Sequence, residues 1–530
     1  MKVLITDEIS ESGLLPLAED PRIEVDKKLG LSIPELHEVI GDYEAIITRS
    51  GTLIDADLIS HAHKLKIVAR AGVGIDNVDV EAASSKGIIV VNAPYGNVNS
   101  AAEHTMAIML SLCRNVPVAN SSLKSGEWQR APFTGRELKG KTVGIIGLGK
   151  VGGRVARRCR AFESNVITYD PYISEKRADD FGVKLVPLED IIRFADIITV
   201  HTPLNNETRN LISATSFEGM QDGVMVINCA RGGIINEEAM LNALESGKCI
   251  GAAFDVWSQE PPQSEVLKKL IAQPNMLVTP HLGANTFEAQ KNVAVDVSKE
   301  IVNFINGNPL TNAVNIPRFD PDVMEHMRPF MELIAIMGDF ISQLAPPNPN
   351  KITFTYNGKL ARFDCAPLGV CGLAALLNHC SDQEVNMVNA SLIARGLGIE
   401  VESVRSTETD SFSSLITLTL ESTEGSRTIS GTLFEGIPKI VKMRNFDLDF
   451  RPEEHMLVMY YPDSPGLIGK IGTILGEAGI NIGNMSLGRQ EKAGEAMVVL
   501  SVDSQVDAVT LQKVEESISA KFIKAVHLQK

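Results

Sequence analysis

The sequence predicts an α/β protein in which two doubly wound parallel-sheet domains precede two small α+β domains. Three observations carry this prediction. Short apolar runs alternate with helical patterns over residues 1–305, a glycine-rich turn joins one of these runs to a helix, and residues 455–530 follow a strand–helix–strand–strand–helix–strand order. At 530 residues the chain is also too long for a single hydrophobic core.

The composition is that of a globular protein, with 44% hydrophobic and 22% charged residues. The net charge of −16 argues against a nucleic-acid partner, although a local basic pocket would still accept an anionic substrate. No run approaches 18 consecutive apolar residues and no signal pattern precedes the first strand, so we expect a cytoplasmic protein with no membrane partner.

The seven cysteines are scattered and include no CxxC pair, which favours reduced thiols over a disulfide framework. Cys371, His379 and Cys380 could be drawn as metal ligands. They lie in an Ala/Leu-rich stretch that is more typical of a hydrophobic core, so we expect no metal.

The first parallel sheet is predicted from four apolar runs separated by helical stretches. A long apolar helix, roughly Ser100–Cys113, follows them. A later helical stretch, Phe287–Ile305, is expected to return to this sheet, which makes a discontinuous domain of residues 1–98 and 285–316. The four runs are Lys2–Ile5, Ala45–Ile47, Ile67–Ala69 and Ile88–Val91.

The second parallel sheet is predicted from six runs within residues 99–284, each followed by a helix or a loop. This pattern is typical of a nucleotide-binding domain with the Rossmann fold. The six runs are Thr142–Ile146, Val166–Tyr169, Ile197–Val200, Val224–Asn228, Gly251–Phe254 and Met276–Thr279.

The carboxy-terminal part is predicted to form two small domains, residues 317–452 and 453–530. The second of these has the βαββαβ order of a ferredoxin-like sandwich. The first mixes strands and helices, which we place at Ile352–Tyr356, Leu415–Leu420 and Arg427–Leu433 (strands) and at Leu368–Leu377 and Gln383–Leu397 (helices).

A GxGxxG motif follows the strand that ends at residue 146 and begins a helix. Gly147 allows a tight turn, Gly149 lets the backbone approach a pyrophosphate, and Gly152 allows close packing of helix and strand. Asp170 ends the next strand, where a carboxylate can accept hydrogen bonds from ribose hydroxyls and would repel a 2′-phosphate. The motif therefore predicts binding of NAD in preference to NADP.

An arginine, a carboxylate and a histidine follow strands of the same sheet and should meet at its carboxyl edge. His281 can take the hydroxyl proton of a hydroxy acid as a hydride leaves for NAD. Glu260 can orient His281 and raise its pKa, and Arg231 can bind the substrate carboxylate. These residues lie in the segments 228–233, 255–261 and 280–284.

These motifs resemble the D-isomer-specific 2-hydroxyacid dehydrogenase family in order and spacing over residues 1–316. The motifs are GLGKVG (147–152), HTPL (201–204), NCARGG (228–233), DVWSQEPP (255–262) and PHLGANT (280–286). The resemblance implies D stereochemistry and the same three catalytic residues. One departure is Asn236, where the family usually has Asp. Besides the three glycines, Arg231 and His281, the resemblance implies NAD contacts at Lys150, Val151, Asp170, Thr202, Cys229, Ala230, Asp255, Gly283 and Ala284.

Two further arginines follow strands of the first sheet. Arg49, next to Ser50, and Arg70 would face the same edge as the catalytic residues. Two cations beyond the carboxylate clamp indicate a second anionic group on the substrate, for which phosphate is the natural candidate. The alternative is that each arginine belongs to a surface ion pair.

The segments around Arg49 (residues 48–51) and Arg70 (residues 69–74) resemble those of the family members that oxidise 3-phosphoglycerate to 3-phosphohydroxypyruvate, in the first step of phosphorylated L-serine synthesis. The resemblance also covers residues 126–133 and implies that Trp128 and Arg130 reach a neighbouring subunit of a homo-oligomer, expected to be a tetramer. Some relatives have a lysine where this chain has Pro132, so phosphate binding is expected to rely more on Arg130.

Residues 456–485 resemble an ACT domain, the small amino-acid sensor of biosynthetic enzymes. A carboxylate or an amide can hold an amino group, and free helix N–H groups can hold a carboxylate. We therefore expect Tyr461, Asp463 and Asn481 to contact an amino acid, and the resemblance implies L-serine as an inhibitor. The alternative is a purely structural dimerisation module.

Residues 317–452 resemble the intervening domain of the long members of the family, which is sometimes credited with a second anion site. Lys439, Lys442 and Arg444 are candidates for such a site, and a solvated basic face explains them equally well.

Two other functions are compatible with part of these patterns. A binding protein that uses NAD as a sensor would share the dinucleotide fold, but it would require docking surfaces rather than a terminal sensor module. A dehydrogenase for glycerate or lactate would share the catalytic residues, but it would not need Arg49 and Arg70.

Overall fold

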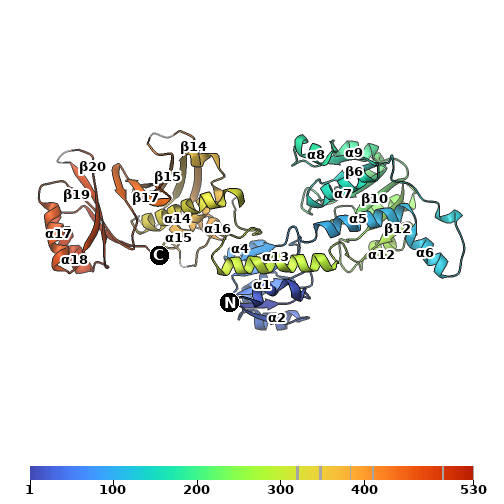
Figure 1. Ribbon diagram of the computed structural model, residues 1–530, viewed down its shortest axis with the longest axis horizontal. Coiled ribbons are helices and arrows are strands. Elements are labelled where there is room, and N and C mark those ends of the chain that lie inside the picture. Colours follow the sequence, from blue (N-terminus) through green and yellow to red (C-terminus); the bar gives the residue numbers. More distant parts are fainter. Residues whose placement is uncertain (318–320, 345–348, 382, 409–410, 492–493, 529–530) are drawn as a thin grey trace.

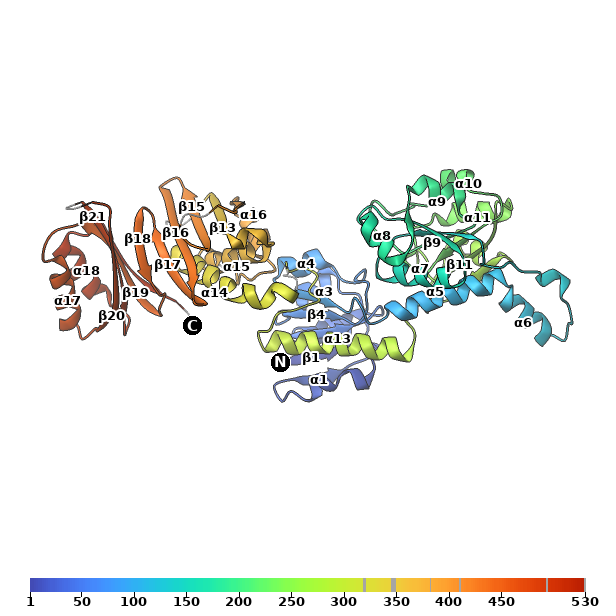
Figure 2. The same ribbon diagram turned by 45° about the horizontal axis from the view of Figure 1, so that its top comes forward.

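The computed structural model describes residues 1–317, 321–344, 349–381, 383–408, 411–491 and 494–528. These residues form four sheets, each with its own helices, and the sheets lie in a row (Figure 1). The first sheet lies between the second sheet on one side and the third and fourth on the other (Figure 2). Within these residues, no helix combines the length and the apolar character needed to cross a membrane.

The first sheet has five parallel strands in the order β2-β1-β3-β4-β5. This is the flavodoxin-like order of a doubly wound sheet, as predicted. The strands are β1 (Lys2–Ile5), β2 (Glu24–Lys27), β3 (Ala45–Thr48), β4 (Ile67–Arg70) and β5 (Ile89–Asn92). The helices are α1 (Leu15–Ala18), α2 (Ile33–Ile40), α3 (Ala56–His61) and α4 (Val80–Ser85).

Successive strand residues point to opposite faces of the first sheet and so form two cores. Leu4 and Ile46 pack against helices α2, α3 and α4. Val3 and Ile47 pack instead against α1 and α13 (Phe287–Ile305), whose Val297 is fully buried. The predicted return of the chain to the first sheet is confirmed.

The second sheet has seven parallel strands in the order β12-β11-β10-β9-β6-β7-β8, the doubly wound arrangement predicted for a nucleotide-binding domain. Helices α5, α7 and α8 cover one face, and α9 to α12 cover the other. The strands are β6 (Thr142–Ile146), β7 (Asn165–Tyr169), β8 (Lys184–Leu185), β9 (Ile197–Val200), β10 (Val224–Asn228), β11 (Cys249–Phe254) and β12 (Met276–Val278). The helices are α5 (Val98–Cys113), α6 (Val116–Lys124), α7 (Lys150–Ala161), α8 (Glu175–Phe181), α9 (Leu188–Phe194), α10 (Ala214–Gly219), α11 (Glu237–Glu245) and α12 (Glu265–Ile271).

The sequence patterns missed one edge strand in each of the first two sheets, β2 in the first and β8 in the second. The second sheet therefore has seven strands, and the prediction of six is wrong. β8 contains only two residues, too few to show a periodicity. β2 reads Glu-Val-Asp-Lys and is largely exposed, so it lacks the apolar run that marks a buried strand.

The third sheet has six strands in the order β14-β13-β15-β16-β17-β18 and is covered on one face by helices. All of its neighbouring strands are antiparallel except β13 and β14. The strands are β13 (Lys351–Gly358), β14 (Glu400–Ser406), β15 (Ser414–Ser422), β16 (Gly425–Phe434), β17 (Ile437–Met443) and β18 (Phe446–Phe450), and the helices are α14 (Pro321–Leu344), α15 (Ala366–Leu377) and α16 (Ala390–Gly396).

The helix predicted over Gln383–Leu397 is wrong in its first half, since α16 begins at Ala390. Two asparagine side chains hold the preceding segment in turns, because Asn389 Oδ1 accepts from the backbone N–H of Asn386 (2.8 Å) and Asn386 Oδ1 accepts from that of Val388 (2.9 Å). Such local bonds compete with a helix.

The fourth sheet is antiparallel, in the order β20-β21-β19-β22, and confirms the predicted βαββαβ succession. One face packs against α17 and α18. The other face, including Met456 and Val499, shares a core with the third sheet. The elements are β19 (His455–Pro462), α17 (Leu467–Glu477), β20 (Ile482–Arg489), β21 (Glu495–Val502), α18 (Ala508–Ile518) and β22 (Phe522–His527).

Candidate active site

The glycine-rich turn between β6 and α7 has a different backbone environment at each of its three glycines. Gly147 has a φ of +94°, which other residues rarely adopt. A Cβ atom on Gly152 would lie 2.0 Å from the carbonyl oxygen of Gly147. A Cβ on Gly149 would meet nothing within 4 Å, so there is open space in front of the α7 N-terminus. This geometry fits a bound pyrophosphate.

Asp170 lies at the end of β7, beside this turn. Its Oδ2 accepts from the backbone N–H of Leu148 (2.9 Å) and its Oδ1 from that of Tyr172 (3.0 Å). The hydroxyl of Thr202 is buried and has no hydrogen-bond partner within the described chain, so it is available to a ligand. A fixed carboxylate at this position fits the ribose of NAD and disfavours a 2′-phosphate.

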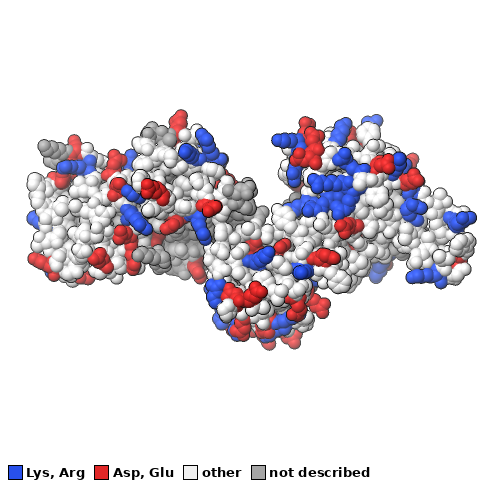
Figure 3. Space-filling model, viewed as in Figure 1, with Lys and Arg blue, Asp and Glu red and all other residues white. Residues whose placement is uncertain are grey.

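The helix that begins at this turn is strongly basic although the chain as a whole is acidic. On the face seen in Figure 3, the largest group of Lys and Arg side chains lies over α7. Its first residue, Lys150, reaches toward the first sheet, where the ammonium lies 3.6 Å from the centre of the Tyr95 ring and 3.4 Å from the oxygen of Pro94. The basic residues of α7 are Lys150, Arg154, Arg157, Arg158 and Arg160.

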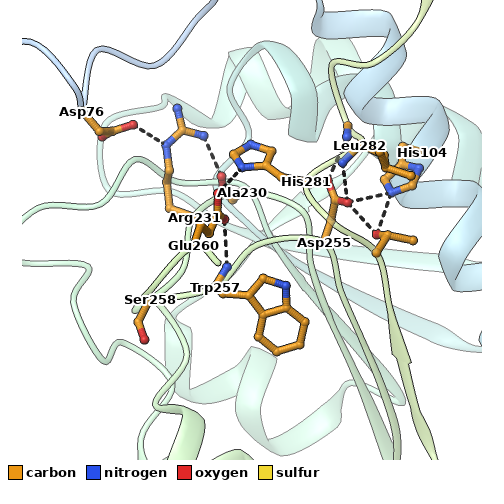
Figure 4. Close-up of polar contacts among 12 residues, drawn as sticks. Asp76, His104, Ala230, Arg231, Asp255, Trp257, Ser258, Glu260, His281 and Leu282 are labelled. Carbon is orange, nitrogen blue, oxygen red and sulfur yellow. Dashed lines mark hydrogen bonds and ion pairs between the residues drawn. The ribbon is translucent and has the colours of Figure 1, made fainter. Parts of the chain in front are cut away.

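The structure brings His281 and Glu260 into direct contact, with 2.7 Å between Nδ1 and Oε2 (Figure 4). Burial raises the pKa of Glu260, but the hydrogen bond and the charge of His281, together with the N–H of Trp257, outweigh it, so the net pKa is lowered and the carboxylate is ionised at neutral pH. A carboxylate can only accept, so Nδ1 of His281 carries a proton. Nε2 is therefore left to exchange a proton with a substrate.

Backbone geometry fixes the direction of both side chains. Glu260 Oε1 accepts from the backbone N–H of Trp257 (3.1 Å). His281 has a φ of +56°, an uncommon left-handed conformation for a residue other than glycine. Such strained residues concentrate at functional sites.

Arg231 spans the space between the first two sheets. Its Nε donates to Oδ2 of Asp76 in the first domain (2.9 Å), and its Nη1 donates to the oxygen of Ala230 (2.6 Å; Figure 4). A Cβ on Gly74 would lie 2.0 Å from Nη2 of Arg231, so a larger residue there would displace the guanidinium from this position.

Arg70 and Arg49 lie close to Arg231 and make a local cluster of positive charge. Burial, together with the nearby guanidinium of Arg231 and, more weakly, that of Arg49, lowers the pKa of Arg70 to about 10. The buried Nε of Arg70 has no hydrogen-bond partner among the described residues. Ser50, next to Arg49, is exposed. Three gathered guanidinium groups can hold an anion with more than one charge.

Asp255 organises the loop that carries His281, together with a residue that the sequence patterns did not select, His104 of α5. Asp255 is buried and its pKa is lowered, because hydrogen bonds from His104, Thr279 and the Leu282 N–H outweigh the opposite effect of burial. The four donors to it are His104 Nε2 (3.1 Å), Thr279 Oγ1 (2.5 Å), Leu282 N (2.7 Å) and Gly283 N (2.8 Å).

His104 and Asp76 are the main contributors that the sequence analysis missed. His104 is one of several polar residues in the largely apolar helix α5, and Asp76 follows the segment around Arg70 without any motif. A polar residue on a largely apolar helix is a weak signal, but it was the signal available for His104.

The remaining predicted NAD contacts lie around the same sheet edge. Cys229 and Ala230 directly follow β10, and burial raises the pKa of the Cys229 thiol to about 12, so this thiol is neutral. Val151 is partly buried in the first turn of α7, and Ala284 follows Gly283 in the loop after β12. Asn236, the departure from the family pattern, caps α11 by accepting from the N–H of Ala239, a role that Asn fills as well as Asp.

Other predicted residues are not brought to this site within one chain. Arg130 is exposed on the segment after α6, which projects away from the second sheet (Figure 1). Tyr461 is buried in the core beneath α17, Asp463 pairs with Arg489 (3.1 Å), and Asn481 donates to Asp503 (3.0 Å).

His201 is another buried residue at the glycine-rich turn. Its burial predicts that the free energy of unfolding depends on pH. Burial lowers its pKa to about 4. The unfolded chain binds a proton near the ordinary histidine pKa of about 6.5, so between these two values only the unfolded state is protonated. The free energy of unfolding should therefore fall by about 3 kcal/mol as the pH is lowered from 6.5 to 4.

Denaturant unfolding at a series of pH values would measure this effect. Both tryptophans, Trp128 and Trp257, lie within residues 99–284, so their fluorescence reports on this part of the chain. The variant His201→Asn should lose stability less steeply between pH 6.5 and 4. Equal slopes for parent and variant would contradict the assignment.

Three parts of the chain match known family models. Residues 106–283 match the D-isomer specific 2-hydroxyacid dehydrogenase NAD binding domain. Residues 326–444 match the D-3-phosphoglycerate dehydrogenase intervening domain, and residues 455–518 match the ACT domain.

Similar proteins extend over the whole chain. A D-3-phosphoglycerate dehydrogenase of Archaeoglobus fulgidus is 40% identical over 99% of this chain and 100% of its own length. One of Bacillus subtilis is 39% identical over 98% and 99%, respectively. Among solved structures, the D-lactate dehydrogenase of Aquifex aeolicus in complex with NAD and lactic acid aligns with a TM-score of 0.54 and 26% identity, over 60% of this chain and 100% of that chain.

Proposed function

The chain belongs to the D-3-phosphoglycerate dehydrogenases of the D-isomer specific 2-hydroxyacid dehydrogenase family, and on this premise we propose that its Arg231, Glu260 and His281 oxidise D-3-phosphoglycerate to 3-phosphohydroxypyruvate. The chain is an NAD-dependent oxidoreductase. The proposed reaction is the first step of phosphorylated L-serine synthesis. The observation that carries the proposal is the His281–Glu260 contact next to three gathered guanidinium groups.

Proton transfer is the role of the His281–Glu260 pair. Nε2 of His281 takes the proton of the C2 hydroxyl, and the imidazolium that forms is stabilised by the Glu260 carboxylate, 2.7 Å from Nδ1. NAD held at the glycine-rich turn between β6 and α7 would supply the acceptor for the hydride that leaves C2. Asp255 positions His281 from the far side of the loop, because it holds the N–H groups of Leu282 and Gly283.

Substrate binding is the role of the arginines. Arg231 holds the carboxylate and polarises the C2 oxygen, which becomes a carbonyl in the product. Arg70 and Arg49, with the Ser50 hydroxyl, hold the phosphate. Arg70 is the stronger candidate of the two, because its buried Nε lacks any partner in the described structure, whereas Arg49 already donates to the oxygen of Glu8 (3.2 Å).

The test of this function is a comparison of kcat/KM for 3-phosphoglycerate, D-glycerate and D-lactate with NAD as the oxidant. We expect 3-phosphoglycerate to be preferred by at least about 100-fold, the effect of two charge-assisted hydrogen bonds. Equal turnover of the three acids would favour a general 2-hydroxyacid dehydrogenase. No turnover of any of them would favour an NAD sensor.

We further propose a homo-oligomer, built partly through the segment around α6. Val116, Val118 and Leu123 are about half exposed, and Trp128 is 80% exposed. Beside them lies a cavity of 690 Å³ lined by residues of α5 and of the second sheet. Apolar surface of this kind is typical of an interface. A second copy would cover it and would carry Arg130 toward its partner.

The fourth sheet offers a second interface for an L-serine effector site. Within one chain Asp463 and Asn481 lie at opposite ends of this sheet, because Pro462 pairs with Glu495 whereas Ile482 pairs with Val502. Antiparallel pairing of two copies of the edge strand β20 would bring Asn481 of one copy near Asp463 of the other. Met485 and Leu487 on β20 are exposed, as expected for an edge that a second copy covers.

We propose that L-serine binds between these two residues and inhibits from a distance. Asp463 would hold the amino group after releasing Arg489, which in turn can meet the carboxylate of the ligand. Tyr461 would support the site from the core between the fourth sheet and α17, where its side chain is buried. Two different two-fold interfaces, one at α6 and one at β20, would generate the tetramer that we propose.

The variant Asp463→Ala is predicted to abolish inhibition by L-serine while uninhibited turnover stays near that of the parent. The reason is that the variant removes the charge that holds the ligand's amino group, and a coupling of about 1–3 kcal/mol is enough for inhibition. A serine titration of turnover measures it. Glu516→Ala, an exposed change on α18 of the same module, should keep full sensitivity. An equally sensitive Asp463→Ala would refute the effector site but not the dehydrogenase.

We also propose the domain division 1–98 with 285–316 for substrate, 99–284 for NAD, 317–452 for the intervening domain and 453–530 for the ACT domain. The arrangement of the four sheets supports it. All seven cysteines are free thiols, which supports a reducing cytoplasmic location.

A further inference from the structure

Two histidines meet where the third and fourth sheets join, far from the catalytic residues. His455 is the first residue of β19 and His527 is the last residue of β22, and the two are directly paired across these strands. Their Nδ1 atoms lie 3.2 Å apart, and their ring planes are inclined by 23°. The carboxylate of Glu454 lies 3.5 Å from Nε2 of His455.

The backbone of His527 is held in place by the helix α14. Its N–H donates to Oε1 of Gln343 (3.0 Å), and its carbonyl oxygen accepts from Nε2 of the same residue (2.8 Å). Gln343 also donates to Asp339 (2.8 Å), which contacts His379 (2.7 Å). The histidine pair is therefore positioned by a chain of polar contacts rather than left on a mobile surface.

The separations suit a small cation of the zinc class. One ligand atom from each of Glu454, His455 and His527 lies within 4.8 Å of the other two. Two ligands at about 2.0–2.1 Å from a tetrahedral zinc ion lie about 3.3 Å from each other, close to the 3.2 Å between the Nδ1 atoms. Two imidazoles and one carboxylate are typical ligands for Zn²⁺ and poor ligands for Mg²⁺ or Ca²⁺.

We propose that Glu454, His455 and His527 form a binding site for Zn²⁺ or a similar transition-metal ion. The ion joins the start of β19, and with it the connection from the third sheet, to the end of β22. Since His527 is also bonded to α14, the ion stabilises the contact between the intervening and the ACT domains. It takes no part in hydride transfer, because all three ligands lie outside the active site.

The experiment is a calorimetric titration of the full-length, chelator-treated protein with Zn²⁺ at pH 7.5. We expect one site for each chain, together with a higher unfolding temperature when Zn²⁺ is present. His455→Ala and His527→Ala should each weaken binding at least tenfold, since even the loss of a supporting contact to a metal ligand costs about 10–100-fold. Glu454→Gln keeps the side-chain shape and should also weaken binding.

A second stacked histidine pair provides the control. His37 and His61 of the first domain have ring centres 4.3 Å apart and lie beside Asp57. The double variant His37→Ala, His61→Ala should bind Zn²⁺ like the parent. The proposal is overturned if this control loses the site, or if the His527→Ala variant, folded as judged by its unfolding transition, binds Zn²⁺ as tightly as the parent.

Proton competition is an independent test, because only neutral imidazoles bind a metal. Binding should weaken by at least tenfold between pH 7.5 and pH 5.5, because protons then compete with the metal ion for the imidazole nitrogens. Affinity that does not change over this range would also overturn the proposal, since it would show that the histidines are not ligands.

Discussion

Replacing His281 with alanine should lower kcat for 3-phosphoglycerate about 10²–10⁴-fold, the usual effect of removing a general base. In the variant the hydroxyl proton has no acceptor. In the parent the acceptor is Nε2 of His281, and the 2.7 Å contact between Nδ1 and Glu260 sets the orientation of this ring. The dissociation constant for NAD should hardly change. Steady-state kinetics and a fluorescence titration with NADH measure the two quantities.

The companion variant Glu260→Gln separates proton transfer from positioning. It preserves the size of the side chain but removes the charge that stabilises the imidazolium, so kcat should fall less than in His281→Ala. His61→Ala, an exposed change on α3 of the first domain, serves as the control and should leave kcat unchanged. Near-parental turnover in His281→Ala would mean that another group accepts the proton.

Replacing Arg70 with alanine should raise KM for 3-phosphoglycerate about 10–100-fold and raise KM for D-glycerate far less. A hydrogen bond between charged groups contributes about 1.5–3 kcal/mol, and only the phosphorylated substrate can lose it. Arg49→Ala should act in the same direction with a smaller effect, because Arg49 already donates to the backbone oxygen of Glu8. Initial rates on both substrates measure the difference.

Arg70→Lys tests whether the planar guanidinium is needed, and it should give an intermediate KM because lysine keeps the charge but loses the fork of donors. Arg177→Ala, an exposed change on α8, is the control and should alter neither KM. Equal losses on 3-phosphoglycerate and D-glycerate would show that Arg70 and Arg49 do not bind the phosphate.

Much of the fold could be predicted because its signals are local. Each buried parallel strand is a short apolar run, and the glycine-rich turn combines a positive φ at Gly147 with a close approach at Gly152. Helix α13 has the predicted bounds, since Thr286 caps it and a regular apolar face follows. Strands without an apolar run, such as β2 and β8, left no such signal.

The candidate site was predictable where its residues lie beside strand ends. Arg231, Glu260 and His281 belong to segments that follow β10, β11 and β12, and neighbouring parallel strands bring such segments to one edge. His104 and Asp76 could not be found in this way. They reach the site from α5 and from a loop of the first domain, and their partners Asp255 and Arg231 are distant in sequence.

The sequence by itself determined the order of the four sheets and the NAD-binding turn, and it predicts His281 as the proton acceptor, because each depends on residue types at short spacings. Only the tertiary structure decided which charges compensate one another. Arg231 pairs with Asp76 across 155 positions, Asp463 pairs with Arg489, and His455 meets His527 on the first and last strands of one small domain. Contacts of this kind depend on how sheets pack and pair, and local sequence patterns carry no record of that packing.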